Sequence, residues 1–210
     1  NTACATTDTG FADASVETSV TTVSTSGVAG MTTYRLQVSL PDDVHNVYAL
    51  AGTPEGDLTM PPAYQVASPF GVDTGGVSPL ISDVVAEAEF DSWLTVGMTD
   101  GSDPSAISTS PGLGLDGWSA EAGFSTSNGA IFWMSPDRGP TGSGITMAQL
   151  TVPTAESGAA SGVVQGRSDA NGDSRDWQTT VSWTWDAGAD TGFADASVET
   201  SVTTVSTSGV

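Results

Sequence analysis

The sequence contains the same segment twice. Residues 8–28 read DTGFADASVETSVTTVSTSGV, and residues 190–210 repeat these letters without a change, at an offset of 182 residues (190 − 8). Such a period in a sequence usually indicates a period in the object that the chain builds. The first copy runs on into the strand-like segment 32–40, whereas the second copy ends the sequence. We therefore expect the second copy to find its β-partner in another molecule.

Three explanations of the duplication are open. The chain is one window of a tandem array with a unit of 182 residues (190 − 8), or a subunit whose tail fills the place of the first copy in the next subunit. In the third explanation, the duplication is artificial: the second copy is a strand of a neighbouring molecule that is numbered as part of this chain. The residues before the copies, NTACATT and WTWDAGA, differ, so residues 1–7 are a special start or a cap. All three explanations imply that contacts between successive units matter.

The charge of the chain excludes several classes of partner. There are 25 acidic side chains against 4 basic ones, all of them Arg, and the formal net charge is −21. This surface repels nucleic acid and anionic lipid, and it suits divalent cations and high ionic strength. No apolar run is long enough for a membrane span. The length fits one domain of sandwich size, and a start without Met fits a processed, secreted protein.

The reactive side chains predict no enzyme. Cys4 is the single cysteine, which excludes a disulfide framework and a cysteine zinc site. His45 is the single histidine and lies in a turn-like segment, and there is no nucleophile elbow, phosphate loop or dinucleotide motif. We assign no catalytic and no cofactor-binding residue.

Alternating apolar and polar side chains predict an all-β chain. The strongest strand predictions are 32–40, 90–98 and 177–185, and shorter ones cover 47–51, 130–134, 145–152 and 163–166. Asn128-Gly129 predicts a hairpin turn between GFSTS and AIFWM. Segments 53–82 and 99–120 are expected to be long loops. The predicted fold is a two-sheet antiparallel β-sandwich, jelly-roll-like, with an extra exchanged or linking terminal strand.

The repeated segment itself is ambiguous by spacing. Val16, Val20 and Val23 lie four and three residues apart, which is a helical interval, yet Thr, Val and Ser dominate the segment. We predict a strand over 15–26 at a sheet edge, where another chain can complete the hydrogen bonding. The predicted assembly residues are Phe11, Val16, Val20, Val23, Phe193, Val198, Val202 and Val205. The domain organisation follows as 1–28, 29–189 and 190–210.

A loop near the C-terminal strand predicts a calcium site. Asp169, Asn171, Asp173 and Asp176 place oxygen atoms at the spacing of the D-x-N-x-D loops that bind Ca²⁺. The glycine stands earlier than in such loops, and their bidentate Glu is replaced by Thr180. The alternative is an Asx-rich turn bridged by Arg175.

Two further features bear on carbohydrate chemistry. Glu87, Glu89 and Asp91 alternate in a predicted strand, which is compatible with a carboxylate pair of a glycosidase or with the solvent face of an ordinary strand. Of the six Trp residues, Trp118 is the best candidate for an exposed ring that stacks on sugars; Trp177, Trp183 and Trp185 share one strand face, a spacing more typical of a core.

A series of segments carries a family resemblance. In order they are YRLQVSL, VYALAG, PPAYQVASPFGVDTGG, FDSWLTVGMTDG, NGAIFWMSPDRGP, MAQLTVP and VVQGRS. Together they resemble an uncharacterised β-domain that recurs, often in several copies, in secreted proteins of marine algae and other protists. The resemblance covers roughly 32–185. It implies an extracellular location and a multi-copy architecture, but no activity, cofactor or catalytic residue.

These observations lead to one expected function and two rivals. We expect an extracellular structural protein whose units assemble end to end into a filament or array by strand donation, with copies of itself as partners. The first rival is a calcium-dependent module that binds glycans through its long loops. The second is a β-sandwich glycosidase that uses Glu87, Glu89 or Asp91.

Overall fold

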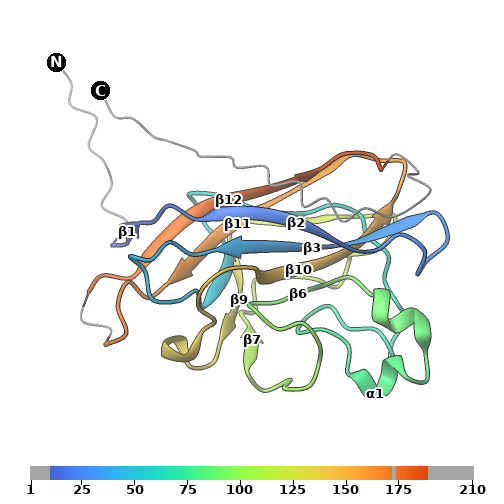
Figure 1. Ribbon diagram of the computed structural model, residues 1–210, viewed down its shortest axis with the longest axis horizontal. Helices are drawn as coiled ribbons and strands as arrows, with labels where there is room; N and C mark the ends of the chain where they lie inside the picture. Colours follow the sequence, from blue (N-terminus) through green and yellow to red (C-terminus); the bar gives the residue numbers. More distant parts are fainter. Residues whose placement is uncertain (1–9, 172–173, 189–210) are drawn as a thin grey trace.

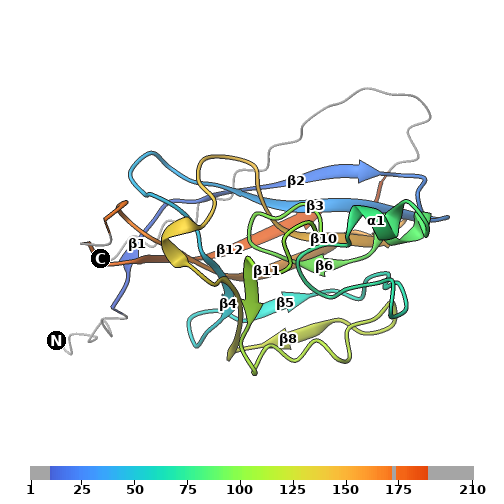
Figure 2. The same cartoon turned by 90° about the horizontal axis from the view of Figure 1, so that it is seen from below.

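The computed structural model describes residues 10–171 and 174–188, and two β-sheets pack face to face in it (Figures 1 and 2). Sheet A has the strand order β1 (Ala12–Asp13), β12 (Trp177–Trp185), β11 (Gly158–Gly166), β4 (Ala49–Gly52), β9 (Gly129–Trp133) and β7 (Ile107–Thr109); β5 (Leu58–Met60) pairs with β11 and with β8 (Phe124–Thr126). Sheet B has the order β2 (Glu17–Ser24), β3 (Met31–Ser39), β10 (Ile145–Pro153) and β6 (Trp93–Leu94). The strand pairs are antiparallel except that of β1 with β12.

The core lies between the two sheets. Leu36 of β3, Leu150 of β10 and Trp183 of β12 are almost fully buried there. The indole N–H of Trp183 also donates to the backbone carbonyl of Gln37 at 2.8 Å, so one side chain fastens sheet A to sheet B. A buried Trp combines a large apolar surface with a satisfied polar group, which fixes the spacing of the sheets.

Helical turns cover part of the outer face of sheet B. They are α1 (Pro79–Ser82) and the 3₁₀ helix η1 (Ala86–Phe90). A second 3₁₀ helix, η2 (Pro136–Arg138), follows β9 in the chain. Gln149 of β10 donates to the carbonyls of Glu89 and Asp91, at 2.9 Å each. Strand β10 is therefore buried on both faces. None of the helices in the described ranges is long and apolar enough to cross a membrane.

The structure confirms most of the strand predictions and the two-sheet antiparallel sandwich. The predicted strand 177–185 has the bounds of β12, and 32–40 differs from β3 by one residue at each end. The segments 47–51, 130–134, 145–152 and 163–166 all overlap strands. The jelly-roll connection and the exchanged strand stay predictions.

The strand predicted over 90–98 is wrong except for β6, Trp93–Leu94. Asp91, which precedes β6, makes side-chain contacts with another loop. Both carboxylate oxygens of Asp91 accept backbone N–H groups, from Val66 at 2.8 Å and from Val72 at 2.6 Å. These contacts anchor the end of η1 to a distant loop. The residues before Asp91 form η1, and only Trp93 and Leu94 pair with β10.

The predicted hairpin at Asn128-Gly129 is also wrong. Strand β8 pairs with β5, and β9 pairs with β4 and β7, so the two strands around the turn do not pair with each other. The turn type that we predicted needs positive φ at both central residues, and Gly129 is not among the glycines with positive φ. The predicted loops 53–82 and 99–120 contain β5, α1 and β7.

Candidate functional site

The described part of the first repeat copy belongs to both sheets. Ala12 of β1 lies opposite Trp177 in a parallel register, and its N–H donates to the carbonyl of Asp176 at 2.8 Å. Strand β2 then runs antiparallel to β3, from Glu17 opposite Ser39 onwards. Figures 1 and 2 show β2 alongside β3, at the edge of sheet B. The prediction of an edge strand in this segment is confirmed, because β2 ends the strand order of sheet B.

The inward face of the copy consists of small apolar side chains. Ala12, Ala14, Val16 and Val20 pack against the core, while the residues between them, such as Asp13 and Glu17, point to solvent. Val23 is on the opposite face, with Asp13 and Glu17, and is 39% exposed. The register of β2 against β3 shifts between Thr22 and Ser24, so the regular pairing is interrupted at Val23.

The end of the copy forms a shaped turn. The hydroxyl oxygen of Ser24 accepts N–H groups from Ser26 at 3.3 Å and from Gly27 at 3.0 Å. Gly27 lies against the ring of Phe90, where a Cβ atom would come within 2.3 Å of the ring. Gly30 has a φ of 74°, which favours glycine, and it leads into β3. The copy thus carries its own strand, bulge and turn.

Both strands of the copy sit at sheet edges. Strand β1 is the last strand of sheet A next to β12, and β2 is the last strand of sheet B next to β3. Each backbone hydrogen bond contributes a net of about 1 kcal/mol, and the burial of the valines adds to it. A segment held only at edges can be supplied from outside without threading between other strands.

The predicted assembly residues of the first copy are described by the structure, whereas those of the second copy are not. Phe11 is half-buried, and its carbonyl accepts a bond from Arg175 at 3.5 Å. The predicted residues of the second copy lie outside the described residues; they are Phe193, Val198, Val202 and Val205. Sequence analysis missed β1, although the alternation of Ala12, Ala14 and Val16 is a signal that it could have used.

The residues predicted to bind calcium have other partners. Asp169 accepts N–H groups from Asn171 at 2.9 Å and from Ser174 at 2.7 Å, as in an Asx turn. Asp176 accepts two bonds from Arg167, at 2.9 and 3.1 Å. Asp173 lies outside the described residues. Within residues 10–171 and 174–188, no group of three or more Asp, Glu, His or Cys side chains is close enough to hold one metal ion. The calcium site stays a prediction.

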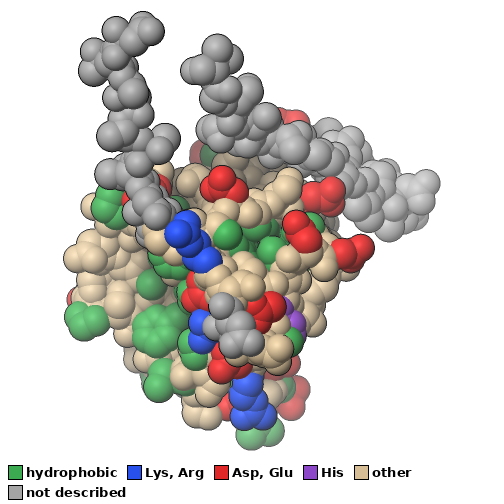
Figure 3. All heavy atoms as spheres, turned by 90° about the vertical axis from the view of Figure 1, so that its left-hand side faces the viewer, with side chains coloured by type: hydrophobic (Ala, Val, Ile, Leu, Met, Phe, Trp, Pro, Cys, Tyr) green, Lys and Arg blue, Asp and Glu red, His purple; other side chains and the backbone are tan. Residues whose placement is uncertain are grey.

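The ion pairs of Arg167 fix the loop before β12. Its guanidinium contacts Asp137 and Asp176 at 2.9 Å each, and hydrogen bonding to Asp176 is the main reason why the Arg167 pKa is raised. Tyr48 donates to Asp176 at 3.0 Å, and burial raises the pKa of its phenol. Figure 3 shows this end of the molecule, where basic side chains lie among acidic ones. The contacts with Arg167 and Tyr48 fix the position of Asp176, whose backbone carbonyl accepts the N–H of Ala12 in β1.

The three carboxylates of the glycosidase hypothesis do not share one strand face. Glu87 and Glu89 lie in η1, and Asp91 follows it. Burial raises the pKa of Asp91 to about 6, against the opposing effect of the N–H groups of Val66 and Val72. Trp118 is not the exposed ring that we predicted: it is 4% exposed and donates to the carbonyl of Pro61.

Comparisons of the chain with protein-family models, with curated proteins and with solved structures found no match. The resemblance to a secreted algal and protist domain therefore stays a prediction, and the site has to be interpreted from its own geometry.

Proposed function

We propose that this chain is an extracellular structural protein whose β-sandwich units join end to end through the repeated segment. Residues 190–210 of one unit bind, on the next unit, at the edges where the described part of the first copy, residues 10–28, lies here. The observation that carries the proposal is the place of the first copy, which lies at the edges of both sheets and packs Val16 and Val20 onto the core. Because the second copy has the same sequence, it fits the same edges on another molecule.

The reach of the polypeptide favours joining between molecules. The nine residues of β12 span about 26 Å, and β1 binds at the end that begins with Trp177. Gly188 is fixed beyond the other end of β12, where its N–H donates to the carbonyl of Thr154 at 2.8 Å. Ala194 corresponds to Ala12 and follows Gly188 by 6 residues (194 − 188), which span at most about 22 Å. The second copy therefore cannot take the β1 position on its own unit.

Joining also involves an exchange of identical strands. In each unit the first copy occupies the edges that a neighbour's second copy would bind. Because the two copies make the same contacts, the exchange is nearly neutral in contact energy, and concentration decides it. We therefore expect joined units at high protein concentration and separated units on dilution.

Sedimentation velocity over a range of protein concentrations tests the proposal. We expect the full chain to form species whose mass grows with concentration, and a chain without residues 190–210 to stay monomeric. The double variant Val198→Asp/Val202→Asp, which changes the counterparts of Val16 and Val20, is expected to stay monomeric as well. The matched control is Val205→Asp, because its counterpart Val23 is exposed, and it is expected to assemble like the full chain.

Two outcomes contradict the proposal. Undiminished assembly of the chain without residues 190–210 would remove the second copy from the contact. Equal behaviour of Val205→Asp and of the double variant would show that added charge, rather than the buried face of the strand, controls association.

A further inference from the structure

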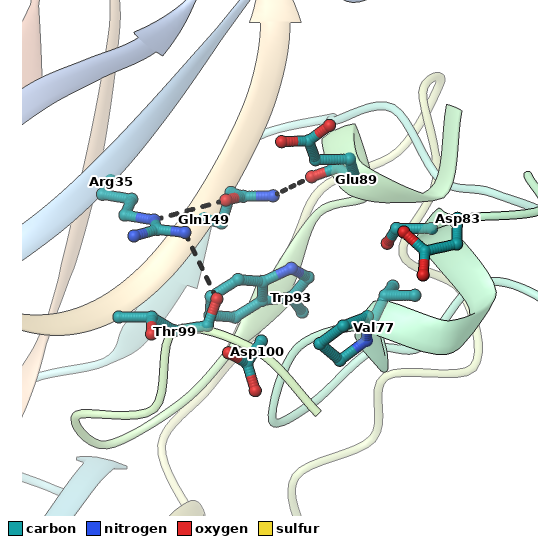
Figure 4. Close-up of a pocket in the computed structure, with 10 residues that line it drawn as sticks. Arg35, Val77, Asp83, Glu89, Trp93, Thr99, Asp100 and Gln149 are labelled. Atoms are coloured by element: carbon teal, nitrogen blue, oxygen red, sulfur yellow. Dashed lines mark hydrogen bonds between the residues drawn. The ribbon is translucent and has the colours of Figure 1, made fainter. Parts of the chain in front are cut away.

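A hollow of about 300 Å³ lies between the outer face of sheet B and the segment that carries α1 and η1 (Figure 4). Its floor is one row across three strands, because Arg35 of β3 and Trp93 of β6 both pair with Gln149 of β10. The carboxylates around it are Asp83, Glu89 and Asp100. Sequence analysis did not find this set, since strand pairing alone brings it together.

Trp93 offers a hydrogen-bond donor to this hollow. Its side chain is buried, with 2% exposed, yet its indole N–H has no hydrogen-bond acceptor among the described residues. The indoles of four of the other five tryptophans donate to a backbone carbonyl; these are Trp118, Trp133, Trp177 and Trp183. Figure 4 shows the nitrogen-bearing edge of Trp93 turned toward the space between η1 and α1. Among the described residues, the buried side-chain atom without a partner is Gln65 Nε2, so the N–H of Trp93 is reached by solvent in the hollow and can donate to an acceptor oxygen of a ligand.

Arg35 supplies further donors to the same space. Its guanidinium donates to the side-chain oxygen of Gln149 at 3.4 Å and to the carbonyl of Thr99 at 3.2 Å. No carboxylate oxygen of the described residues lies within ion-pair distance of it. Burial lowers the pKa of Arg35, and the charges of nearby carboxylates oppose that effect. The guanidinium carries five N–H groups, so several stay free for a ligand.

The charges around the hollow exclude two kinds of ligand. Three carboxylates against one guanidinium disfavour an anion. A single divalent cation does not fit either, because within the described part of the chain no three acidic, His or Cys side chains come close enough to share one ion. The ligand must therefore span the hollow and contact donors and acceptors at separate points.

We propose that this hollow binds one neutral sugar residue, a pyranose with several free hydroxyl groups. A hydroxyl group both donates and accepts, so one ring can donate to Asp83, Glu89 or Asp100 while it accepts from Trp93 and Arg35. A lysine or arginine side chain of a peptide only donates, and it would leave Trp93 unsatisfied and face the guanidinium of Arg35. The volume lies at the small end of ligand pockets and fits a single ring. This site needs neither calcium nor the joining of units.

The test follows the indole N–H of Trp93 by two-dimensional NMR of the ¹⁵N-labelled full chain, at a concentration where it is monomeric. The signal is assigned with Trp93→Phe. The probes are D-glucose, D-galactose, D-mannose and N-acetyl-D-glucosamine, titrated singly into the high millimolar range without calcium. We expect at least one of them to shift the Trp93 signal in a saturable way. Asp83→Asn, which removes one acceptor charge, should weaken that binding about tenfold or more, and Asp43→Asn on an exposed loop should leave it unchanged.

Three results would overturn the inference. The first is that no sugar shifts the Trp93 signal. The second is that Asp83→Asn and Asp43→Asn bind the sugar equally well, which would place the contact elsewhere. The third is that L-arginine amide shifts the signal when the sugars do not, which would identify the hollow as a site for basic peptides. None of these results bears on the strand joining, which sedimentation tests separately.

Discussion

Val20 of the first repeat copy lies opposite Leu36 in the antiparallel pair of β2 and β3, and both side chains belong to the packed interior. This pair joins the repeated segment to the centre of the sandwich, since Leu36 is completely buried. The first copy is therefore part of the folded unit, and its apolar face packs against the core.

The two valines of β2 should respond differently to a charge. In a chain without residues 190–210, Val20→Asp places a carboxylate against the core, so we expect the free energy of unfolding to fall by about 2–4 kcal/mol. Val23→Asp alters an exposed side chain and should change it by less than about 0.5 kcal/mol. Urea denaturation measures both. Equal losses would contradict the placement of Val20 on the core face and of Val23 on the solvent face of β2.

The turn after β2 should not tolerate a methyl group at Gly27. A Cβ atom there would lie 2.3 Å from the Phe90 ring, so Gly27→Ala should destabilise the chain by about 1–3 kcal/mol through overpacking. Gly117 has open space around its Cβ position and no positive φ, so Gly117→Ala is the control, with an expected change near zero or slightly stabilising. Thermal unfolding compares the two variants, and a harmless Gly27→Ala would argue against the contact with η1.

Stability should depend on the protonation of Asp91. Burial raises the pKa of Asp91 to about 6 in the folded chain. The folded state therefore binds a proton more readily than the unfolded state does. As a result, Asp91 contributes less stability as the pH rises from about 4 to about 6. The difference in unfolding free energy between the unchanged chain and Asp91→Asn should be larger at the acidic end of this window than at neutral pH, by about 2 kcal/mol. Denaturation curves at both pH values check this. A difference that does not vary with pH would show that Asp91 titrates normally.

The same substitution in the two repeat copies should shift assembly in opposite directions. Val20→Asp weakens the first copy and vacates the edges, so a neighbour's second copy meets less competition and association increases. Val202→Asp weakens the incoming copy, so association decreases. Light scattering at matched concentrations compares them. A shift in the same direction for both variants would rule out competition for one site.

The alternation of side chains was sufficient to predict most of the long strands. In β3, Tyr34, Leu36 and Val38 alternate with polar residues and enter the core, and the predicted strand at 177–185 needed no change. Such strands are determined by local pattern, because one face must be buried whichever strand lies beside it.

Contacts between distant residues decided the parts that could not be predicted. Asp91 takes the N–H groups of Val66 and Val72, which lie 25 and 19 residues away, and this ends the strand that alternation had indicated. The hollow depends on Arg35 and Trp93, which share a row only because β10 pairs with both of their strands. A linear pattern contains neither pairing order nor long-range capture of backbone groups.

A disulfide between copies tests the joining of units most directly. Ser19 lies opposite Gln37, and Ser201 is its counterpart in the second copy, so Ser201→Cys and Gln37→Cys place two thiols at the Cβ spacing of opposed residues, about 5 Å. All chains in this experiment also carry Cys4→Ser, which removes the native thiol, and Val20→Asp, which weakens the binding of the first copy to the edge of sheet B. Under mild oxidation at high protein concentration, we predict a ladder of disulfide-linked chains, and linked dimers when the two single-cysteine chains are mixed. Only monomers, whether unlinked or linked within one chain, would contradict the account.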